Sequence, residues 1–162
     1  ARIYAEVQGY GTSSDAHHMT APHPEGTHAA RAMTEAILSA GLSPKDIDYV
    51  NAHGSSTTLN DSTECKAIRL ALGDRANKVA VSGTKGQHGH ALGATGAMEA
   101  AICAMALERG YLPGTTNLAN QDPACDLDVI PPGGREQRVS HLVTNAFGFG
   151  GINASLVLGA AD

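Results

Sequence analysis

The segment Leu92–Leu107 constrains the fold of this 162-residue chain more than any other part. It reads LGATGAMEAAICAMAL, and apart from Glu99 and Thr95 every residue is apolar or small. We expect a helix over Leu92–Glu108, and a helix that is hydrophobic on all sides must be covered on all sides. It is either an ordinary deeply buried core helix or a helix packed closely against a second one. Under both interpretations we expect the chain to dock against another sheet-bearing half.

The rest of the chain alternates between strand and helix patterns. Helical patterns begin at Thr27 and at Asp61 or Ser62. Strand patterns lie at Arg2–Gly11, Ile47–Ala52, Lys78–Ser82, Leu142–Ala146 and Asn153–Leu158. This order, β-α-β-α-β-α-β-β, predicts a single α/β domain over residues 1–162, with a mixed five-stranded sheet, a mainly parallel core and a buried central helix. Asp126–Ile130 has the pattern of a further short strand.

Composition argues against several classes of partner. The chain carries 11 Lys and Arg against 16 Asp and Glu, and aromatic residues make up only 4% of it, so we expect no nucleic-acid binding. No apolar run reaches the roughly 18 residues of a membrane span, and no targeting segment is expected. Three cysteines, Cys65, Cys103 and Cys125, form no CxxC pair. They favour a reducing compartment, which we take to be the cytoplasm.

Three glycine-containing polar clusters follow predicted strands, at the sheet edge where open α/β folds bind ligands. They span residues 51–57, 82–90 and 145–153. In the first, His53 ends a strand. In the second, Lys85 and His90 lie five residues apart across a flexible loop, so both can reach one site. In the third, glycines flank Phe147 and Phe149 and allow backbone N–H groups to approach a ligand, as in an oxyanion hole.

Each cluster also has a simpler explanation. His53-Gly54 can be a capped turn, and Lys85 can be a solvated loop lysine. His88 and His90 could be half of a metal site, but no third ligand at metal spacing is evident, so we predict none. The segment 148–151 lacks a GxGxxG fingerprint and precedes a strand, which argues against a dinucleotide site. Glu99, alone in an apolar helix, needs a positive partner if ionised, and Lys85 is the candidate.

In this order, the motifs resemble the C-terminal half of a β-ketoacyl-acyl-carrier-protein synthase of the Cys-His-His class, of the elongating type II kind found in fatty acid synthesis. The motifs that carry the resemblance are His53-Gly54-Ser55-Ser56-Thr57 with Asn60-Asp61, Thr84-Lys85 through Gly89-His90 to Glu99, and Asn145 through Asn153. Further likeness at Ala5–Met19 and Asn117–Asp128 extends it through nearly the whole chain. The resemblance implies the thiolase fold, in which two repeated halves stack buried helices between two sheets.

The resemblance also implies a reaction, the decarboxylative Claisen condensation. A cysteine takes an acyl group from acyl carrier protein, malonyl carrier protein loses CO2, and the resulting carbanion attacks the acyl thioester. It implies that His53 and His90 face the malonyl thioester. Neutral imidazoles there would stabilise the enolate by donating Nε–H bonds to its oxygen. Lys85, beside Glu99, would balance the local charge and hold the loop that carries His90.

Further residues receive roles from the same resemblance. The Phe149 backbone N–H would form half of an oxyanion hole for the acyl thioester, and the Phe149 ring would act as a gate. Ser55 and Thr57 would hydrogen-bond the pantetheine arm. Phe147 and Gly150 would also contact substrate, and Asp61 would support the site structurally. Ser55, Gly86 and His88 depart from the family's usual Thr, Ser and Thr.

The nucleophile of the family is missing from this chain. Cys65 and Cys103 lie in the middle of predicted helices and Cys125 in a loop, so none qualifies. We therefore expect the nucleophilic Cys in an N-terminal half, without which this chain is inactive. Expected partners are that half, acyl carrier protein and a second copy of the complete synthase in a homodimer. No cofactor is expected beyond the phosphopantetheine that carries the substrates.

Three alternatives remain open. The first is half of a polyketide ketosynthase of the same architecture. The second is a non-catalytic partner resembling a chain-length factor, although such partners need not keep both His53 and His90 with Lys85. The third is a histidine-rich metal-binding module.

Overall fold

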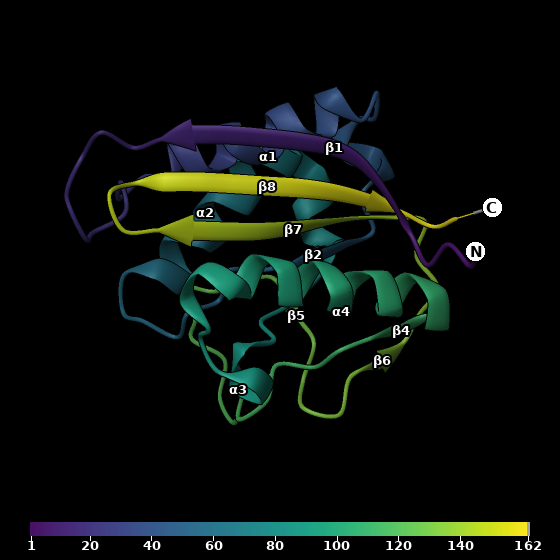
Figure 1. Ribbon diagram of the computed structural model, residues 1–162. Helices are drawn as coiled ribbons and strands as arrows, with labels where there is room; N and C mark the ends of the chain where they lie inside the picture. Colours follow the sequence, from purple (N-terminus) through teal and green to yellow (C-terminus); the bar gives the residue numbers. More distant parts are fainter. Residues whose placement is uncertain (162) are drawn as a thin grey trace.

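A mixed sheet with helices on both faces forms the body of the computed structural model, which describes residues 1–161 (Figure 1). The sheet has six strands in the order β1-β8-β7-β2-β3-β5. β7, β2, β3 and β5 are parallel neighbours, whereas β1, β8 and β7 pair antiparallel. The bounds are β1 (Glu6–Ser14), β2 (Tyr49–Asn51), β3 (Ala80–Ser82), β5 (Asp128–Val129), β7 (His141–Gly148) and β8 (Ile152–Gly159).

The expected strand number of five was too low. The two residues of β5 join the sheet edge, because Asp128 and Val129 pair with Ala80 and Val81 of β3. A separate two-stranded sheet pairs β4 (Tyr111–Leu112) with β6 (Arg135–Glu136). The alternating order of strands and helices otherwise matches the sequence pattern.

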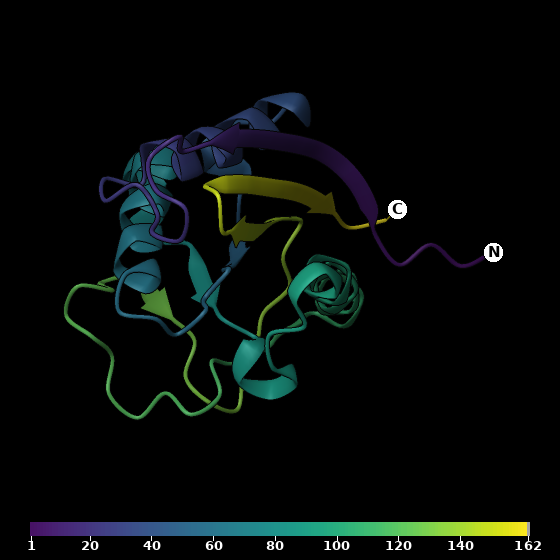
Figure 2. The same ribbon diagram turned by 60° about the vertical axis from the view of Figure 1, so that its left-hand side comes forward.

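Helices cover the two faces of the sheet unequally. α1 (Thr27–Ser39) and α2 (Asn60–Leu72) pack on one face, and α4 (Thr95–Arg109) packs on the other (Figure 2). The flexible loop expected between Lys85 and His90 contains a single helical turn, α3 (Lys85–His88). The expected helix from Leu92 begins as a 3-10 turn, Leu92–Ala94, because Leu92 has a φ of +51° that a regular helix excludes. Short 3-10 segments also occupy Pro44–Asp46 and Gly73–Asn77.

Two glycines in β1 allow α1 to lie directly on the strand. A Cβ added to Gly11 would overlap the Ala32 carbonyl oxygen and approach the Ala36 backbone N to 2.5 Å. Gly9 meets Ala36 and Ala40 in the same way. The alanines of α1 are small enough to match, so this interface is backbone against backbone.

We therefore expect Gly11→Ala to destabilise the chain by about 2 kcal/mol, as overpacking of a tight interface does. Urea denaturation of wild type and variant measures the free energy of unfolding. Gly93→Ala is the matched control, because a Cβ there meets nothing within 4 Å. Equal stability of Gly11→Ala and wild type would show that β1 and α1 can separate without cost.

The apolar helix α4 is covered on one side only by this chain. Its buried residues are Thr95, Glu99, Cys103, Ala106 and Leu107, which face the sheet. Ala97, Met98 and Ala101 on the opposite side are exposed, and Figure 2 shows no element packed over that side among the described residues. The interpretation as an ordinary core helix is therefore wrong for this chain. Within residues 1–161, no helix has the length and hydropathy needed to cross a membrane.

Candidate active site

His53 follows β2 and is held in place by a buried carboxylate. The backbone N–H groups of His53 and Gly54 donate to the two oxygens of Glu64 at 2.8 and 2.9 Å. Asn145 Nδ2 donates to the same carboxylate at 3.1 Å, and burial raises the pKa of Glu64. Glu64 lies on the apolar face of α2 beside Cys65. The supporting role of Glu64 was not predicted, although a carboxylate on the apolar face of a helix indicates a buried hydrogen-bonding role.

The imidazole of His53 has one nitrogen occupied and one free. The Phe147 backbone N–H donates to His53 Nδ1 at 3.3 Å, so the proton of the neutral ring lies on Nε2. Burial, with smaller contributions from Lys85 and His90, lowers the pKa of His53 to about 3. At neutral pH the ring is therefore an uncharged Nε2–H donor.

His90 has the same arrangement on a different loop. Its Nδ1 accepts the Leu92 backbone N–H at 3.1 Å and lies 3.2 Å from Thr95 Oγ1. A neutral His90 therefore also carries its proton on Nε2. The His53 and His90 ring centroids are 5.5 Å apart, with an interplanar angle of 78°. His53 is buried, whereas His90 is exposed in this chain.

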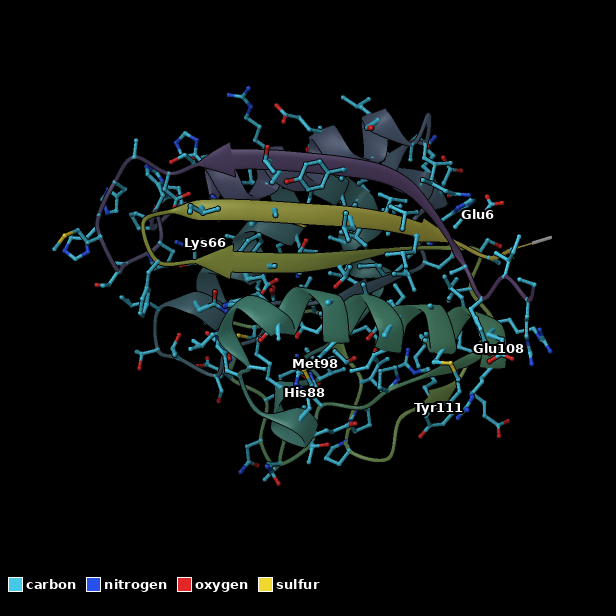
Figure 3. The ribbon with its side chains drawn as sticks, in the orientation of Figure 1. Glu6, Lys66, His88, Met98, Glu108 and Tyr111 are labelled. Atoms are coloured by element: carbon cyan, nitrogen blue, oxygen red, sulfur yellow. The ribbon has the colours of Figure 1, made fainter. Side chains whose placement is uncertain are left out.

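Lys85 connects the two histidine-bearing loops to α4. Its Nζ lies 2.6 Å from Glu99 Oε1 and also donates to the backbone carbonyl oxygen of His53. Glu99 is fully buried, and burial raises its pKa while Lys85 opposes that shift. His88 is the last residue of α3, and its side chain lies on the side toward α4, with Nε2 at 3.2 Å from Thr84 Oγ1 and 4.0 Å from Glu99 Oε1 (Figure 3). Lys85 is thus a buried ion-pair partner and not a solvated loop residue.

A cavity of about 590 Å³ opens beside this cluster. Its lining includes Ser55, Lys85 and His90 together with the loop of residues 115–122. Ser55 Oγ lies 3.1 Å from Thr57 Oγ1. Thr57 therefore does not line the cavity itself but hydrogen-bonds a residue that does. Asp61 supports the same loop by accepting the Ser56 backbone N–H at 3.1 Å. It does not cap α2, which begins at Asn60 without a side-chain cap.

Not all expected site residues come together. Phe149 lies in the turn between β7 and β8 and is 79% exposed. The Gly150 N–H donates to the Met19 carbonyl oxygen at 2.7 Å, which uses that N–H within the chain. The aromatic ring beside His53 is that of Phe147, with centroids 5.8 Å apart. Sequence alone could not separate the two phenylalanines, because both have glycine neighbours.

None of the three cysteine thiols is activated as a nucleophile in this structure. Burial raises the pKa of all three thiols, and that of Cys103 rises to about 12. Each thiol therefore stays protonated at neutral pH. In the described part of the chain, no three His, Cys, Asp or Glu side chains are grouped so as to hold a metal ion.

The pKa of His53 predicts an acid-sensitive stability. Because its pKa falls from an unfolded value near 6.5 to about 3, the unfolded chain binds the extra proton between these values. Stability should fall as pH falls through that window, by up to about 1.4 kcal/mol per pH unit from this group. His53→Asn keeps an acceptor for Phe147 N–H but cannot be protonated, so its stability should fall less steeply. The free energy of unfolding of each protein is measured by urea denaturation at several pH values from 7 to 4. If it fell equally steeply with falling pH in wild type and in His53→Asn, His53 would not be a neutral buried group.

Comparisons with known proteins agree on one family. Residues 4–119 match the family model described as the β-ketoacyl synthase, C-terminal domain. The chain is 47% identical over 158 residues to the 3-oxoacyl-[acyl-carrier-protein] synthase 2 of Coxiella burnetii, and 46% identical over 157 residues to that of Staphylococcus aureus. These alignments cover 98% and 97% of this chain but 38% and 39% of the relatives. The chain thus spans about two fifths of their length.

Solved structures with the same fold include ketosynthases and a β-ketoacyl synthase. A ketosynthase structure described as a type II PKS acyl-carrier protein in complex with its ketosynthase bound to the hexaketide superposes with a TM-score of 0.97 at 38% identity, covering 100% of this chain and 40% of that one. The ishigamide ketosynthase/chain length factor gives 0.94 at 41% identity, with 100% and 39% covered. A β-ketoacyl synthase from Burkholderia phymatum STM815 gives 0.93 at 39% identity, with the same coverage.

Proposed function

This chain belongs to the β-ketoacyl synthase family as a C-terminal domain, and we propose that it supplies the His53, His90 and Lys85 part of the active site of a condensing enzyme in fatty acid chain elongation. The family resemblance expected from the motifs is confirmed, as is the α/β class of a thiolase-like synthase half. The residue roles below are proposals that rest on the geometry of this site.

One observation supports the proposal most strongly. Both His53 Nδ1 and His90 Nδ1 accept backbone N–H groups, so both rings keep Nε2–H free while their centroids lie 5.5 Å apart. Two Nε2–H donors on rings this close together suit one oxygen that becomes negatively charged. The low pKa of His53 keeps that ring a donor without a permanent charge.

The proposed reaction begins with loss of CO2 from a malonyl thioester. The electron pair of the breaking C–C bond moves toward the thioester carbonyl, and His53 and His90 stabilise the enolate oxygen through their Nε2–H groups. The enolate carbon then attacks an acyl thioester on a cysteine, and that thiolate leaves. Lys85 is a positioning residue, because it joins the His53 carbonyl oxygen to the buried Glu99.

The proposal needs a second half for three reasons. The chain contains no activated thiol, the outer side of α4 is exposed and apolar, and His90 is open to solvent. An N-terminal half that brings the cysteine and covers α4 would meet all three needs. The Phe149 N–H and ring would act only in that assembly, as oxyanion donor and gate, with Phe147 and Gly150 beside them. Ser55, with Thr57 behind it, would contact pantetheine in the cavity.

We further propose acyl carrier protein as the substrate carrier, a homodimer of complete synthases, a cytoplasmic location and no cofactor besides phosphopantetheine. Among similar structures, one is a ketosynthase in complex with its acyl-carrier protein and another a ketosynthase in complex with its chain length factor. The polyketide neighbours support a second candidate, half of a polyketide ketosynthase. A chain-length-factor-like role is less well supported, because His53, His90 and Lys85 form a connected cluster here.

The test combines this chain with the Cys-bearing N-terminal half of the same synthase and supplies acyl and malonyl carrier protein. We expect no condensation by the chain alone, and CO2 release with chain elongation by the combination. Products extended by single elongation rounds indicate fatty acid synthesis, and multiply ketonic products indicate the polyketide candidate. An assembled complex that releases no CO2 would refute the enzymatic proposal in favour of the chain-length-factor role.

A further inference from the structure

Cys65 and Cys125 pack at the same part of the core and line the same cavity, although they are 60 residues apart in sequence. Cys65 is on α2 and belongs to the main hydrophobic core, and Cys125 packs against that core from the loop before β5. Each thiol contributes to the pKa of the other, and both side chains border the same cavity. Neither residue has a role in the proposed condensation.

Contacts on either side fix the two thiols in this position. Arg69, one helical turn after Cys65, donates from Nε to Asp126 Oδ1 at 3.0 Å and from Nη2 to the Asp126 carbonyl oxygen at 2.9 Å. The Cys125 N–H donates to the Asp122 carbonyl oxygen at 2.8 Å, which closes a turn. The helix and the loop are therefore already joined one residue from Cys125.

The thiol pair is reachable from solvent through the active-site cavity. Cys65 and Cys125 both line the cavity of about 590 Å³ that also contains Ser55 and His90. Cys125 is only half-buried, so it is the thiol that a small molecule meets first. The cavity is large enough for such a reagent to enter.

We propose that Cys65 and Cys125 form a reversible dithiol modification site, which small neutral or cationic disulfides convert to an intramolecular disulfide. In the first step the Cys125 thiolate attacks one sulfur of the reagent, forming a mixed disulfide and releasing one reagent thiolate. In the second step the Cys65 thiolate attacks the Cys125 sulfur and releases the other. Two electrons pass from the pair to the reagent, and the two thiol protons go to the leaving thiolates through solvent.

Charge near the pair determines which reagents react. Asp61, Glu64, Asp122 and Asp126 surround the two thiols, and Arg69 is occupied by Asp126. This acidic surrounding repels anionic disulfides and attracts cations. Because burial and these carboxylates also raise both thiol pKa values, the reaction should be slow at neutral pH and faster as pH rises.

The experiment exposes the full chain, folded, to cystamine or to oxidised glutathione and maps the products by non-reducing peptide mass spectrometry. We expect a Cys65–Cys125 crosslinked peptide, reversed by dithiothreitol, and formed about tenfold faster by cationic cystamine than by anionic glutathione disulfide. Cys103→Ala is the matched control and should form the bond as wild type does. Cys125→Ser should form no intramolecular disulfide.

A second arm repeats the reaction in denaturant. The unfolded chain should favour the shorter loops that close at Cys65–Cys103 and Cys103–Cys125, because closure of a shorter loop costs less entropy. A native product that stops at a mixed disulfide on Cys125, or that contains Cys103, would overturn the proposal. These readouts measure bonds and not condensation, so failure here leaves the proposed function untouched.

Discussion

Replacing His53 or His90 by alanine should lower malonyl decarboxylation by the assembled enzyme about 10²–10³-fold. Each substitution removes one Nε2–H donor from the oxygen on which the enolate charge develops. The two donors come from separate loops, one behind β2 and one before α4, so neither can substitute for the other. Release of labelled CO2 from malonyl carrier protein in single turnovers measures the effect without depending on the condensation step.

The controls for this prediction separate catalysis from folding. His141→Ala removes a histidine at the start of β7, where its Nδ1 lies 3.0 Å from Gln8 Oε1, and should leave CO2 release unchanged. His90→Gln, whose amide nitrogen can replace an imidazole Nε2–H, should recover part of the rate lost in His90→Ala. If both alanine variants released CO2 at the wild-type rate, these histidines would have no role in decarboxylation.

Lys85→Met should destabilise the chain by about 3–5 kcal/mol, the typical cost of breaking a buried ion pair. The Lys85 side chain is 6% exposed and that of Glu99 is 0% exposed, so removal of Nζ leaves a buried carboxylate whose Oε2 already has no partner. The lysine also anchors the His53 carbonyl oxygen, so decarboxylation should fall as well.

The double variant Lys85→Met with Glu99→Leu tests the cause. It removes both charges, and replacement of a buried ion pair by apolar residues is often neutral. Urea denaturation should therefore show most of the stability restored, while decarboxylation stays low because the anchor of His53 is still missing. If the double variant were as unstable as Lys85→Met, the loss would come from packing at this position and not from an unpaired carboxylate.

The sequence predicted those parts of the site that depend on strand ends. His53, Lys85 and His90 follow parallel strands or lie in the loop after one, and strand ends at one sheet edge bring such residues together. The pairing of Lys85 with Glu99 followed from the cost of a buried charge. The need of α4 for cover followed from its composition, and the structure shows which side lacks that cover.

Other features depend on three-dimensional register, which no local pattern contains. The hydrogen bond from the His53 backbone N–H to Glu64 forms only if α2 turns the face that carries Glu64 toward the end of β2. The Phe147 N–H that sets the tautomer of His53 comes from β7, 94 residues away. Phe149, expected to supply an oxyanion-hole N–H and a gate, is exposed because it lies in the turn between β7 and β8. The position of Cys65 and Cys125 at one cavity depends on a long loop that folds back onto α2.

The most direct test of this account is a crystal structure of the assembled synthase with a non-decarboxylating malonyl thioester analogue. We predict one thioester carbonyl oxygen within about 2.7–3.2 Å of both His53 Nε2 and His90 Nε2. An analogue whose carbonyl oxygen contacts only one imidazole, or that meets a ring through Nδ1, would contradict the two-donor mechanism.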